Sequence, residues 1–282
     1  MSELDLGKKV FFLYPPSVIQ DDLIMRLLDQ EYEVYMLKDH VAALRLFALF
    51  PDSICFVNID AGMGEKEWEA WIRRVMSDPA TRGISIGIIS YNTDETLQKK
   101  YLMDIGIPCG FVKLKLGTEQ SAKILLATLK AAEAKVRRKY VRATCGHDTL
   151  SSLNIREGQL NVSGNLVDIS VVGFSCVLDP DPMLPKNVML HDIQLRLRGT
   201  IIGTEAIIFG KRDGEHPVYV MLFTQRMESL TRQKIRSYIQ TALQNEIEQI
   251  AITGIAPESA SAPSESTPAS DIPDIDELNA AN

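Results

Sequence analysis

The spacing of apolar residues changes near residue 143, and this change limits the possible folds more than any other feature of the chain. Before it, short apolar runs alternate with stretches of helical spacing. After it, the apolar runs are closely spaced and separated by Gly, Asp and Pro. The first pattern is typical of a sheet covered by helices, and the second of a small antiparallel barrel. A chain of 282 residues is long enough for two such domains.

The first half contains five predicted strands and five predicted helices. The strands are Val10–Tyr14, Tyr32–Leu37, Ile54–Ile59, Ile84–Ser90 and Gly110–Lys113. The helices are expected at 18–30, 39–50, 65–77, 94–105 and 118–140. This alternation predicts a doubly wound, flavodoxin-like α/β domain, in which functional residues lie at the carboxyl ends of the strands. The long last helix is expected to leave the domain and carry basic residues to the next one.

The second half contains six or seven predicted short strands and one helix. The strands are Leu160–Val162, Leu166–Ile169, Phe174–Val177, Ile193–Leu197, Ile201–Ile202, Ala206–Phe209 and Val218–Phe223. The segment 212–215 is predicted as a hairpin turn. The helix that follows has an apolar face made of Leu230, Ile235, Ile239, Leu243 and Ile247. We expect this face to pack against the barrel.

These patterns predict an α/β domain at 1–136, a barrel with its closing helix at 137–252 and an acidic tail at 253–282. The tail is rich in Ala, Ser and Pro, and we expect it to be disordered. The last 28 residues carry six acidic residues and no basic one, which accounts for six of the seven net negative charges. The remainder is nearly neutral, so no nucleic-acid partner is expected.

Several other classes of protein are excluded by the sequence. No apolar stretch reaches the roughly 20 residues of a membrane span, and the first residues lack a signal-peptide core, so the expected location is the cytoplasm. The cysteines and histidines are scattered, so no metal site is predicted. No nucleophile–base pair or phosphate-binding glycine loop is found, so we predict neither an enzyme nor a cofactor.

Three residues at predicted strand ends carry a likeness to a known family. Asp60 and Met63 form an Asp-x-x-Met after the third strand, Ser90 ends the fourth strand, and Lys113 ends the fifth. In these positions the first half resembles the receiver domains of two-component response regulators. The resemblance implies that Asp60 is the phosphoacceptor, Ser90 the switch residue and Lys113 the partner of the acyl phosphate.

The first half departs from receivers where phosphorylation needs a metal. Mg²⁺ requires hard oxygen ligands, which receivers supply as an acidic pair after the first strand. Here Tyr14 and Pro15 stand at those positions, and Leu114 replaces the usual proline after the lysine. We therefore expect a vestigial phosphoacceptor site and slow or absent phosphorylation of Asp60. A structural or dimerising role is predicted instead, with a homodimer through this domain.

Two short motifs accompany the predicted barrel. The segment 138–142 reads Arg-Lys-Tyr-Val-Arg, and 168–173 reads Asp-Ile-Ser-Val-Val-Gly. Their order and their separation resemble the PilZ family, whose signature is Arg-x-x-x-Arg followed by Asp/Asn-x-Ser-x-x-Gly. The resemblance implies binding of cyclic di-GMP by Arg138, Arg142, Asp168, Ser170 and Gly173. Arg137, before the first motif arginine, is linked in this family to a stacked, two-molecule form of the ligand.

The residue types suit that ligand, although each has a simpler interpretation. A guanidinium binds phosphate, stacks on purines and matches the O6 and N7 edge of guanine, while a carboxylate accepts from guanine N1–H and N2–H. Taken singly, the arginines could be a solvated helix end, and Asp168, Ser170 and Gly173 could be turn residues. In this order and spacing we favour ligand binding.

The leading hypothesis is a non-enzymatic effector that converts binding of cyclic di-GMP into domain reorientation and altered binding of a protein partner, in motility or adhesion control. The alternative is a phosphorylation-driven response regulator whose barrel is a protein-interaction module. Tyr14 and Pro15 argue against the alternative.

Overall fold

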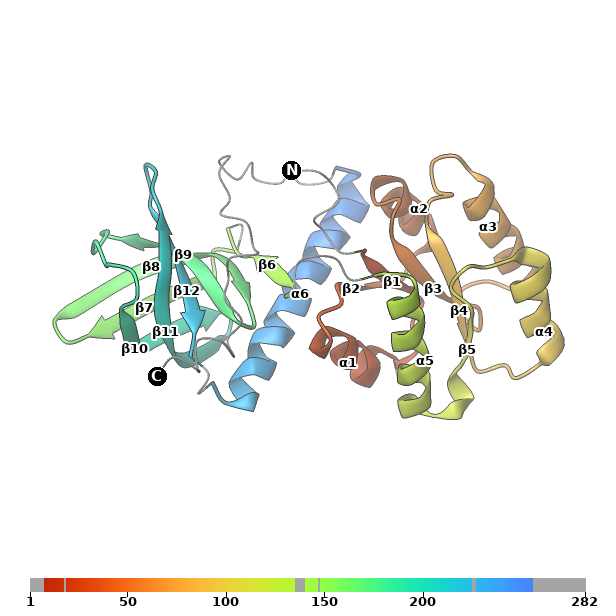
Figure 1. Ribbon diagram of the computed structural model, residues 1–282. Helices are drawn as coiled ribbons and strands as arrows, with labels where there is room; N and C mark the ends of the chain where they lie inside the picture. Colours follow the sequence, from red (N-terminus) through yellow and green to blue (C-terminus); the bar gives the residue numbers. More distant parts are fainter. Residues whose placement is uncertain (1–7, 18, 135–139, 147, 225–226, 256–282) are drawn as a thin grey trace.

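Helix α6 (Ser229–Thr253) lies between a parallel sheet and an antiparallel barrel in the computed structural model of the protein (Figure 1). The structure describes residues 8–17, 19–134, 140–146, 148–224 and 227–255. The sheet is formed by the first half of the chain and the barrel by the second. The predicted fold class, an α/β domain followed by a barrel and a C-terminal helix, is confirmed.

The five strands of the first sheet are all parallel and follow the order β2-β1-β3-β4-β5. Their bounds are β1 Val10–Leu13, β2 Val34–Leu37, β3 Ile54–Asn58, β4 Ser85–Ser90 and β5 Phe111–Lys113. All five coincide with predicted strands. This strand order is that of the doubly wound flavodoxin-like folds.

Alternating side chains of the strands give the sheet two apolar faces. Phe11 and Leu13 belong to one buried cluster, and Val10 and Phe12 belong to another. Successive strand residues point to opposite faces, and both faces of this sheet are covered by helices. The strands are consequently mostly apolar, and all four residues of β1 are fully buried.

Helical segments lie at the predicted positions, with one correction. Their bounds are η2 Ile19–Leu23, α1 Ile24–Asp29, α2 His40–Leu49, α3 Glu65–Ser77, α4 Glu95–Lys99, η3 Lys100–Ile105, η4 Leu114–Leu116 and α5 Thr118–Ala131. The prediction that the fifth helix continues to residue 140 is wrong. Helix α5 ends at Ala131, and Glu133 adopts a positive φ of 50°, which an α-helix cannot include.

Six antiparallel strands close the barrel, because β8 pairs with β7 on one side and with β9 on the other. Around the ring the order is β8-β7-β10-β11-β12-β9, and the short β6 is added to the end of β8. The bounds are β6 Arg142–Thr144, β7 Ser151–Glu157, β8 Leu160–Ser170, β9 Gly173–Asp179, β10 Met189–Leu197, β11 Thr200–Arg212 and β12 Val218–Phe223.

The barrel has more and longer strands than the sequence pattern predicted. Strands β6 and β7 were not predicted, and β8 and β11 were each predicted as two pieces interrupted near Gly164 and Gly203. Gly164 does not end its strand. A Cβ there would lie 2.3 Å from the carbonyl oxygen of Val177 on β9, so the glycine permits a close approach of two strands. A hairpin does connect β11 and β12 as predicted, but its loop spans 213–217, because Arg212 still belongs to β11 and pairs with Val218.

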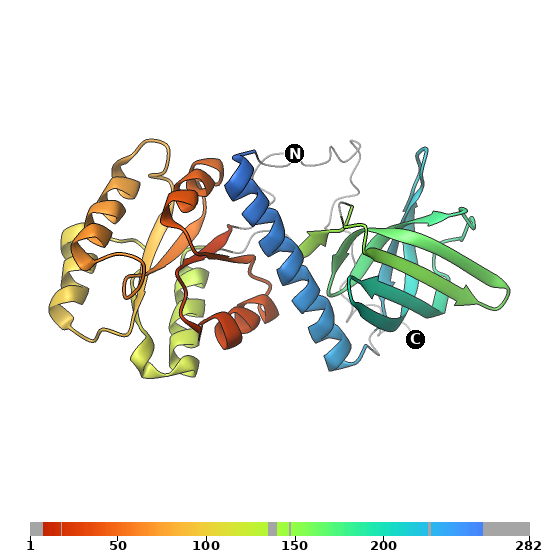
Figure 2. The same ribbon diagram turned by 180° about the vertical axis from the view of Figure 1, so that it is seen from behind.

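Helix α6 packs against both domains, as Figures 1 and 2 show from opposite sides. It contacts β6 and β8 of the barrel and β2, α1 and α2 of the first domain. Its buried residues are Ile235, Tyr238, Ile239, Leu243, Ile247 and Ile250. The prediction that the helix packs against the barrel is confirmed, and its contact with the first domain was not predicted. Leu230, which is 57% exposed, does not belong to the buried face.

The predicted boundaries at residues 136 and 252 stay predictions. The first boundary lies in the undescribed segment 135–139. Of the tail predicted to be disordered, residues 256–282 lie outside the described residues. In the part of the chain that the structure describes, no helix has both the length and the apolar character that a membrane crossing requires.

Candidate functional site

The three predicted receiver-type residues meet at one edge of the first sheet. Asp60 follows β3, and Ser90 and Lys113 end the neighbouring strands β4 and β5, where their Cα atoms are paired in register. The Ser90 hydroxyl donates a hydrogen bond of 2.6 Å to Oδ1 of Asp60. The structure therefore brings Asp60 and Ser90 together, and their assignment as a vestigial phosphoacceptor site stays a prediction.

The carboxylate of Asp60 is already engaged on both oxygens. Oδ1 accepts from Ser90, and Oδ2 accepts from the backbone N–H of Tyr91 at 2.6 Å. Among the ion pairs of the described residues, none joins Asp60 to Lys113. Each carboxylate oxygen keeps a second lone pair, so these hydrogen bonds orient Asp60 without occupying all of its acceptor sites.

Tyr14 occupies the position next to Asp60 at which receivers supply metal ligands. Its φ of 53° lies in the left-handed region, and its ring packs so closely on Gly62 that a Cβ there would lie 2.8 Å from a ring carbon. The Tyr14 hydroxyl is 3.1 Å from Nδ1 of His40, and its carbonyl oxygen accepts from the side-chain amide of Asn58 at 2.8 Å. An aromatic ring thus fills this position. Within the described residues, no group of three or more His, Cys, Asp or Glu side chains is placed to hold a metal ion.

On the barrel, the structure brings together one residue from each of the two motifs at 138–142 and 168–173. Strand β6 pairs with the end of β8 so that Arg142 is opposite Ser170 and Thr144 is opposite Asp168. Arg142 and Asp168 are therefore diagonal neighbours, and Nη1 of Arg142 lies 3.7 Å from Oδ1 of Asp168. The Arg142 side chain is 40% exposed, so its guanidinium can also reach a ligand from solvent.

Asp168 is held in place by a residue that the sequence analysis did not single out. The hydroxyl of Ser175, on β9, donates a 2.6 Å hydrogen bond to Oδ2 of Asp168. The pairing of β8 with β9 shifts register between Leu166 and Asp168, which is the mark of a β-bulge. Ser175 leaves Oδ1 to face Arg142. The position of Ser175, two residues after Gly173, was the only sequence feature that could have pointed to this role.

Ser170 and Gly173 shape the turn between β8 and β9. Ser170 is 2% exposed, and its hydroxyl donates to the carbonyl oxygen of Gly173 at 3.1 Å. Gly173 faces β12, where a Cβ would lie 2.2 Å from the carbonyl oxygen of Met221. These two motif residues thus support the conformation that presents Asp168, and neither has a side chain directed to a ligand. The other two predicted binding residues, Arg137 and Arg138, lie outside the described residues.

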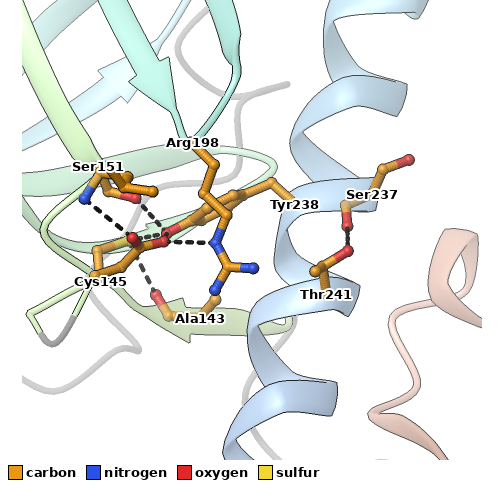
Figure 3. Close-up of polar contacts among 9 residues, drawn as sticks. Ala143, Cys145, Ser151, Arg198, Ser237, Tyr238 and Thr241 are labelled. Atoms are coloured by element: carbon orange, nitrogen blue, oxygen red, sulfur yellow. Dashed lines mark hydrogen bonds and ion pairs between the residues drawn. The ribbon is translucent and has the colours of Figure 1, made fainter.

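A buried polar cluster ties helix α6 to the strand that carries Arg142. Figure 3 shows Tyr238 pointing from α6 toward Cys145 and Ser151 of the barrel. The Tyr238 hydroxyl lies 2.7 Å from that of Ser151 and 3.5 Å from Sγ of Cys145, which directly follows β6. It also donates to Asp148 at 3.2 Å, and Nε of Arg198 donates to the same carboxylate oxygen at 2.9 Å.

Burial sets the ionisation of this cluster. It raises the pKa of the Cys145 thiol to about 11, so the thiol is neutral at pH 7. Burial alone would raise the pKa of Asp148, but hydrogen bonds from Arg198, Leu150 and Ser151 outweigh it and lower that pKa. The Tyr238 hydroxyl therefore forms hydrogen bonds with two neutral side chains and with the carboxylate of one ion pair. These bonds hold α6 to the end of β6.

Comparisons with known proteins found similar solved structures but no similar sequence. The chain matches no protein-family model, and a comparison with curated sequences finds no significant relative. Among solved structures, the PilZ domain with c-di-GMP of YcgR from Escherichia coli is similar at 15% identity, covering 42% of this chain and 98% of that one, with a TM-score of 0.36. A signal receiver domain of an HD domain-containing protein from Pseudomonas fluorescens Pf-5 is similar at 13% identity, covering 46% and 100%, with a TM-score of 0.37.

A third similar structure is the inhibitor of motility (MotI/DgrA) from Bacillus subtilis. It is 20% identical, the match covers 37% of this chain and 50% of that one, and the TM-score is 0.31. The strand order and register of the two sheets define the architecture. On that basis the protein combines a receiver-like domain with a PilZ-like barrel.

Proposed function

We propose that this protein is a non-enzymatic effector that binds cyclic di-GMP at the junction of β6 and β8. The observation that carries the proposal is the pair formed by Arg142 and Asp168, 3.7 Å apart at the edge of the barrel. The motif arginine and the motif aspartate are 26 positions apart in the sequence, and the β6–β8 pairing makes them neighbours.

The two side chains complement the ligand in both charge and hydrogen bonding. Cyclic di-GMP offers phosphodiester oxygens and the O6 and N7 edges of guanine to a guanidinium. The same guanines offer N1–H and N2–H donors to a carboxylate. Oδ2 of Asp168 is taken by Ser175, which leaves Oδ1 and Arg142 facing each other at a distance longer than a good hydrogen bond. Arg138, with Arg137, would complete the arginine side of the site.

The site is connected to the rest of the molecule through α6. Arg142 lies in β6. Cys145, immediately after β6, accepts a hydrogen bond from the hydroxyl of Tyr238 on the helix. The same helix packs against the first domain. A ligand that displaces β6 would therefore change how the two domains are arranged. The changed surface would act on a protein partner in the cytoplasm, in motility or adhesion control.

Titration calorimetry with cyclic di-GMP tests the proposal. The wild type is expected to bind at roughly micromolar affinity or tighter. Arg142→Ala and Asp168→Ala should each weaken binding by roughly 10- to 100-fold, because each removes a charge-assisted hydrogen bond. The measured stoichiometry would distinguish one bound ligand molecule from two.

Arg212→Ala is the matched control. Arg212 is exposed at the end of β11, the strand opposite β8 in the six-stranded ring, so its loss should leave affinity unchanged. No heat with the wild type, or equal loss of affinity in Arg212→Ala and Arg142→Ala, would overturn the proposal.

The alternative function, regulation by phosphorylation, is disfavoured by Tyr14, whose ring packs on Gly62 and which stands where receivers supply a metal ligand. Incubation with acetyl phosphate and Mg²⁺ followed by mass spectrometry tests it. We expect no phosphoryl group on the wild type. Modification that disappears in Asp60→Asn would restore the alternative.

A further inference from the structure

A small cavity lies in the first domain, between η2 and the start of α5, two segments that contact each other (Figures 1 and 2). Its volume is about 100 Å³, which is room for several water-sized groups. The segments that line it follow β1, β4 and β5, so the cavity lies at the carboxyl ends of these strands. Parallel α/β sheets bind their ligands at this edge.

Helix α5 begins at the cavity without a side-chain cap. Its N-cap is Gly117, which has no side chain, and its first residue, Thr118, lines the cavity together with Gly117. The backbone N–H of Ser121 donates to the Gly117 carbonyl oxygen at 3.0 Å and so begins the hydrogen bonds of the helix. The N–H groups of residues 118–120 precede this bond. Such groups form the positive end of a helix and favour an anion.

The hydroxyl of Ser121 is a second, independent sign of a ligand. Ser121 lines the cavity and is only 2% exposed. Within the described part of the chain, its Oγ is buried without a hydrogen-bond partner. A buried hydroxyl without a partner costs free energy, and native structures rarely keep one. A ligand oxygen in the cavity would give this hydroxyl its partner.

The other walls of the cavity are apolar. Ile19 and Leu23 line it from η2, and Leu114 lines it from the turn before α5. All three side chains are buried. A surface of this kind gains free energy by covering an aliphatic group, whereas it offers nothing to a hydrated ion. The cavity therefore suits a ligand with one anionic end and one apolar end.

The acidic residue in the first turn of α5 has cations beside it. The carboxylate of Glu119 lies 3.0 Å from Nζ of Lys123, and its side chain is 73% exposed. The hydrogen bond from Lys123, together with the charge of Arg26, lowers the pKa of Glu119. A paired carboxylate in solvent is screened, so it does not cancel the attraction of the helix end for an anion.

We propose that this cavity binds a small carboxylate with a short branched aliphatic chain. The carboxylate lies at the start of α5 and accepts from the Ser121 hydroxyl, and the chain packs between the apolar walls. Tyr91 also lines the cavity, and its backbone N–H donates to Asp60 at 2.6 Å, so the ligand lies beside the residue that orients Asp60. The site belongs to the first domain and does not depend on the proposed binding of cyclic di-GMP.

An NMR titration of the full chain with 3-methylbutanoate tests the proposal. The amide signals of residues 118–120 should shift and saturate, with a dissociation constant of about 1 mM for so small a ligand. The neutral 3-methylbutanamide should bind roughly tenfold more weakly, because it cannot form charge-assisted hydrogen bonds. Acetate lacks three carbons and should bind roughly 50-fold more weakly, at about fourfold for each buried carbon.

Two variants test the polar end of the site. Ser121→Ala should weaken binding of 3-methylbutanoate by roughly five- to tenfold, without lowering the thermal midpoint, because the hydroxyl has no partner to lose. Thr118→Pro removes one N–H at the first helical position, where proline is tolerated, and should weaken binding by about tenfold. Thr128→Ala is the matched control, since Thr128 lies about 15 Å further along the same helix and should leave binding unchanged.

Each outcome decides the proposal. Saturable shifts at 118–120 in the wild type that weaken in Ser121→Ala but not in Thr128→Ala would support it. Wild-type signals that do not move, or acetate and the amide binding as well as 3-methylbutanoate, would overturn it. Equal affinities in Ser121→Ala and Thr128→Ala would overturn it as well. If Thr118→Pro does not fold, the three ligands on the wild type and the serine variant still decide.

Discussion

The side-chain amide of Gln244 on α6 binds both backbone groups of Met36 on β2. Its Nε2 donates to the Met36 carbonyl oxygen at 2.8 Å, and its Oε1 accepts from the Met36 N–H at 2.9 Å. Strand β2 is the edge of the parallel sheet, and Met36 directs its backbone groups away from β1. The amide thus takes the place of a neighbouring strand and joins the first domain to the barrel's helix.

Replacing Gln244 by Ala should loosen this contact. The Met36 N–H would lose its protein acceptor, so its hydrogen exchange should accelerate by roughly tenfold, as expected for a loss of about one net hydrogen bond. Gln249→Ala, at an exposed position of the same helix, should leave exchange at Met36 unchanged. Equal rates in wild type and Gln244→Ala would show that the amide does not hold the two domains together.

Replacing Tyr238 by Phe should destabilise the barrel. The substitution removes the hydroxyl that bonds Ser151 and Asp148 and leaves their buried oxygens short of a partner, at a cost of about 1–3 kcal/mol. Urea unfolding measures this loss. The control is Tyr91→Phe, at a side chain that is 39% exposed, which should cost much less. A Tyr238→Phe protein as stable as the wild type would contradict the assigned role.

Replacing Gly173 by Ala should lower the thermal midpoint of the ligand-free protein. The added Cβ would lie 2.2 Å from the Met221 carbonyl oxygen, so β9 and β12 would have to separate, at a cost of about 2 kcal/mol or more. Gly203→Ala is matched to it, because a Cβ at Gly203 in β11 meets no atom within 4 Å. Similar midpoints for the two variants would remove the packing explanation for the motif glycine.

The barrel should lose stability in acid through Asp181. Hydrogen bonds from Lys211 and Tyr219 lower the pKa of Asp181 from its usual 3.8 to about 2. A carboxyl with a lower pKa in the folded chain stabilises the fold above pH 3.8, and this contribution is lost as the pH falls through about 2. Urea midpoints of wild type and Asp181→Asn should therefore differ at pH 5 and converge toward pH 2. A difference that does not depend on pH would refute this assignment.

Local patterns in the chain were enough to predict most of the fold. Apolar runs such as Val10–Leu13 were found because a parallel strand buried on both faces is mostly apolar. Asp60 and Ser90 were named through the resemblance to receiver domains, and they meet because parallel strands end at one edge of the sheet. Strands β6 and β7 were missed, since three residues and a half-polar run carry little periodic signal.

Contacts between distant segments could not be predicted from such patterns. The Gly164 position was mistaken for a strand end, because its reason is the backbone of Val177 on another strand. The apolar face of α6 predicted packing against the barrel but not the contact with the first domain, to which side chains such as Gln244 join the helix. The spacing of apolar residues in the sequence indicates whether a residue is buried. Which partner buries it, as Glu31 meets Val141, depends on the packing of the whole chain.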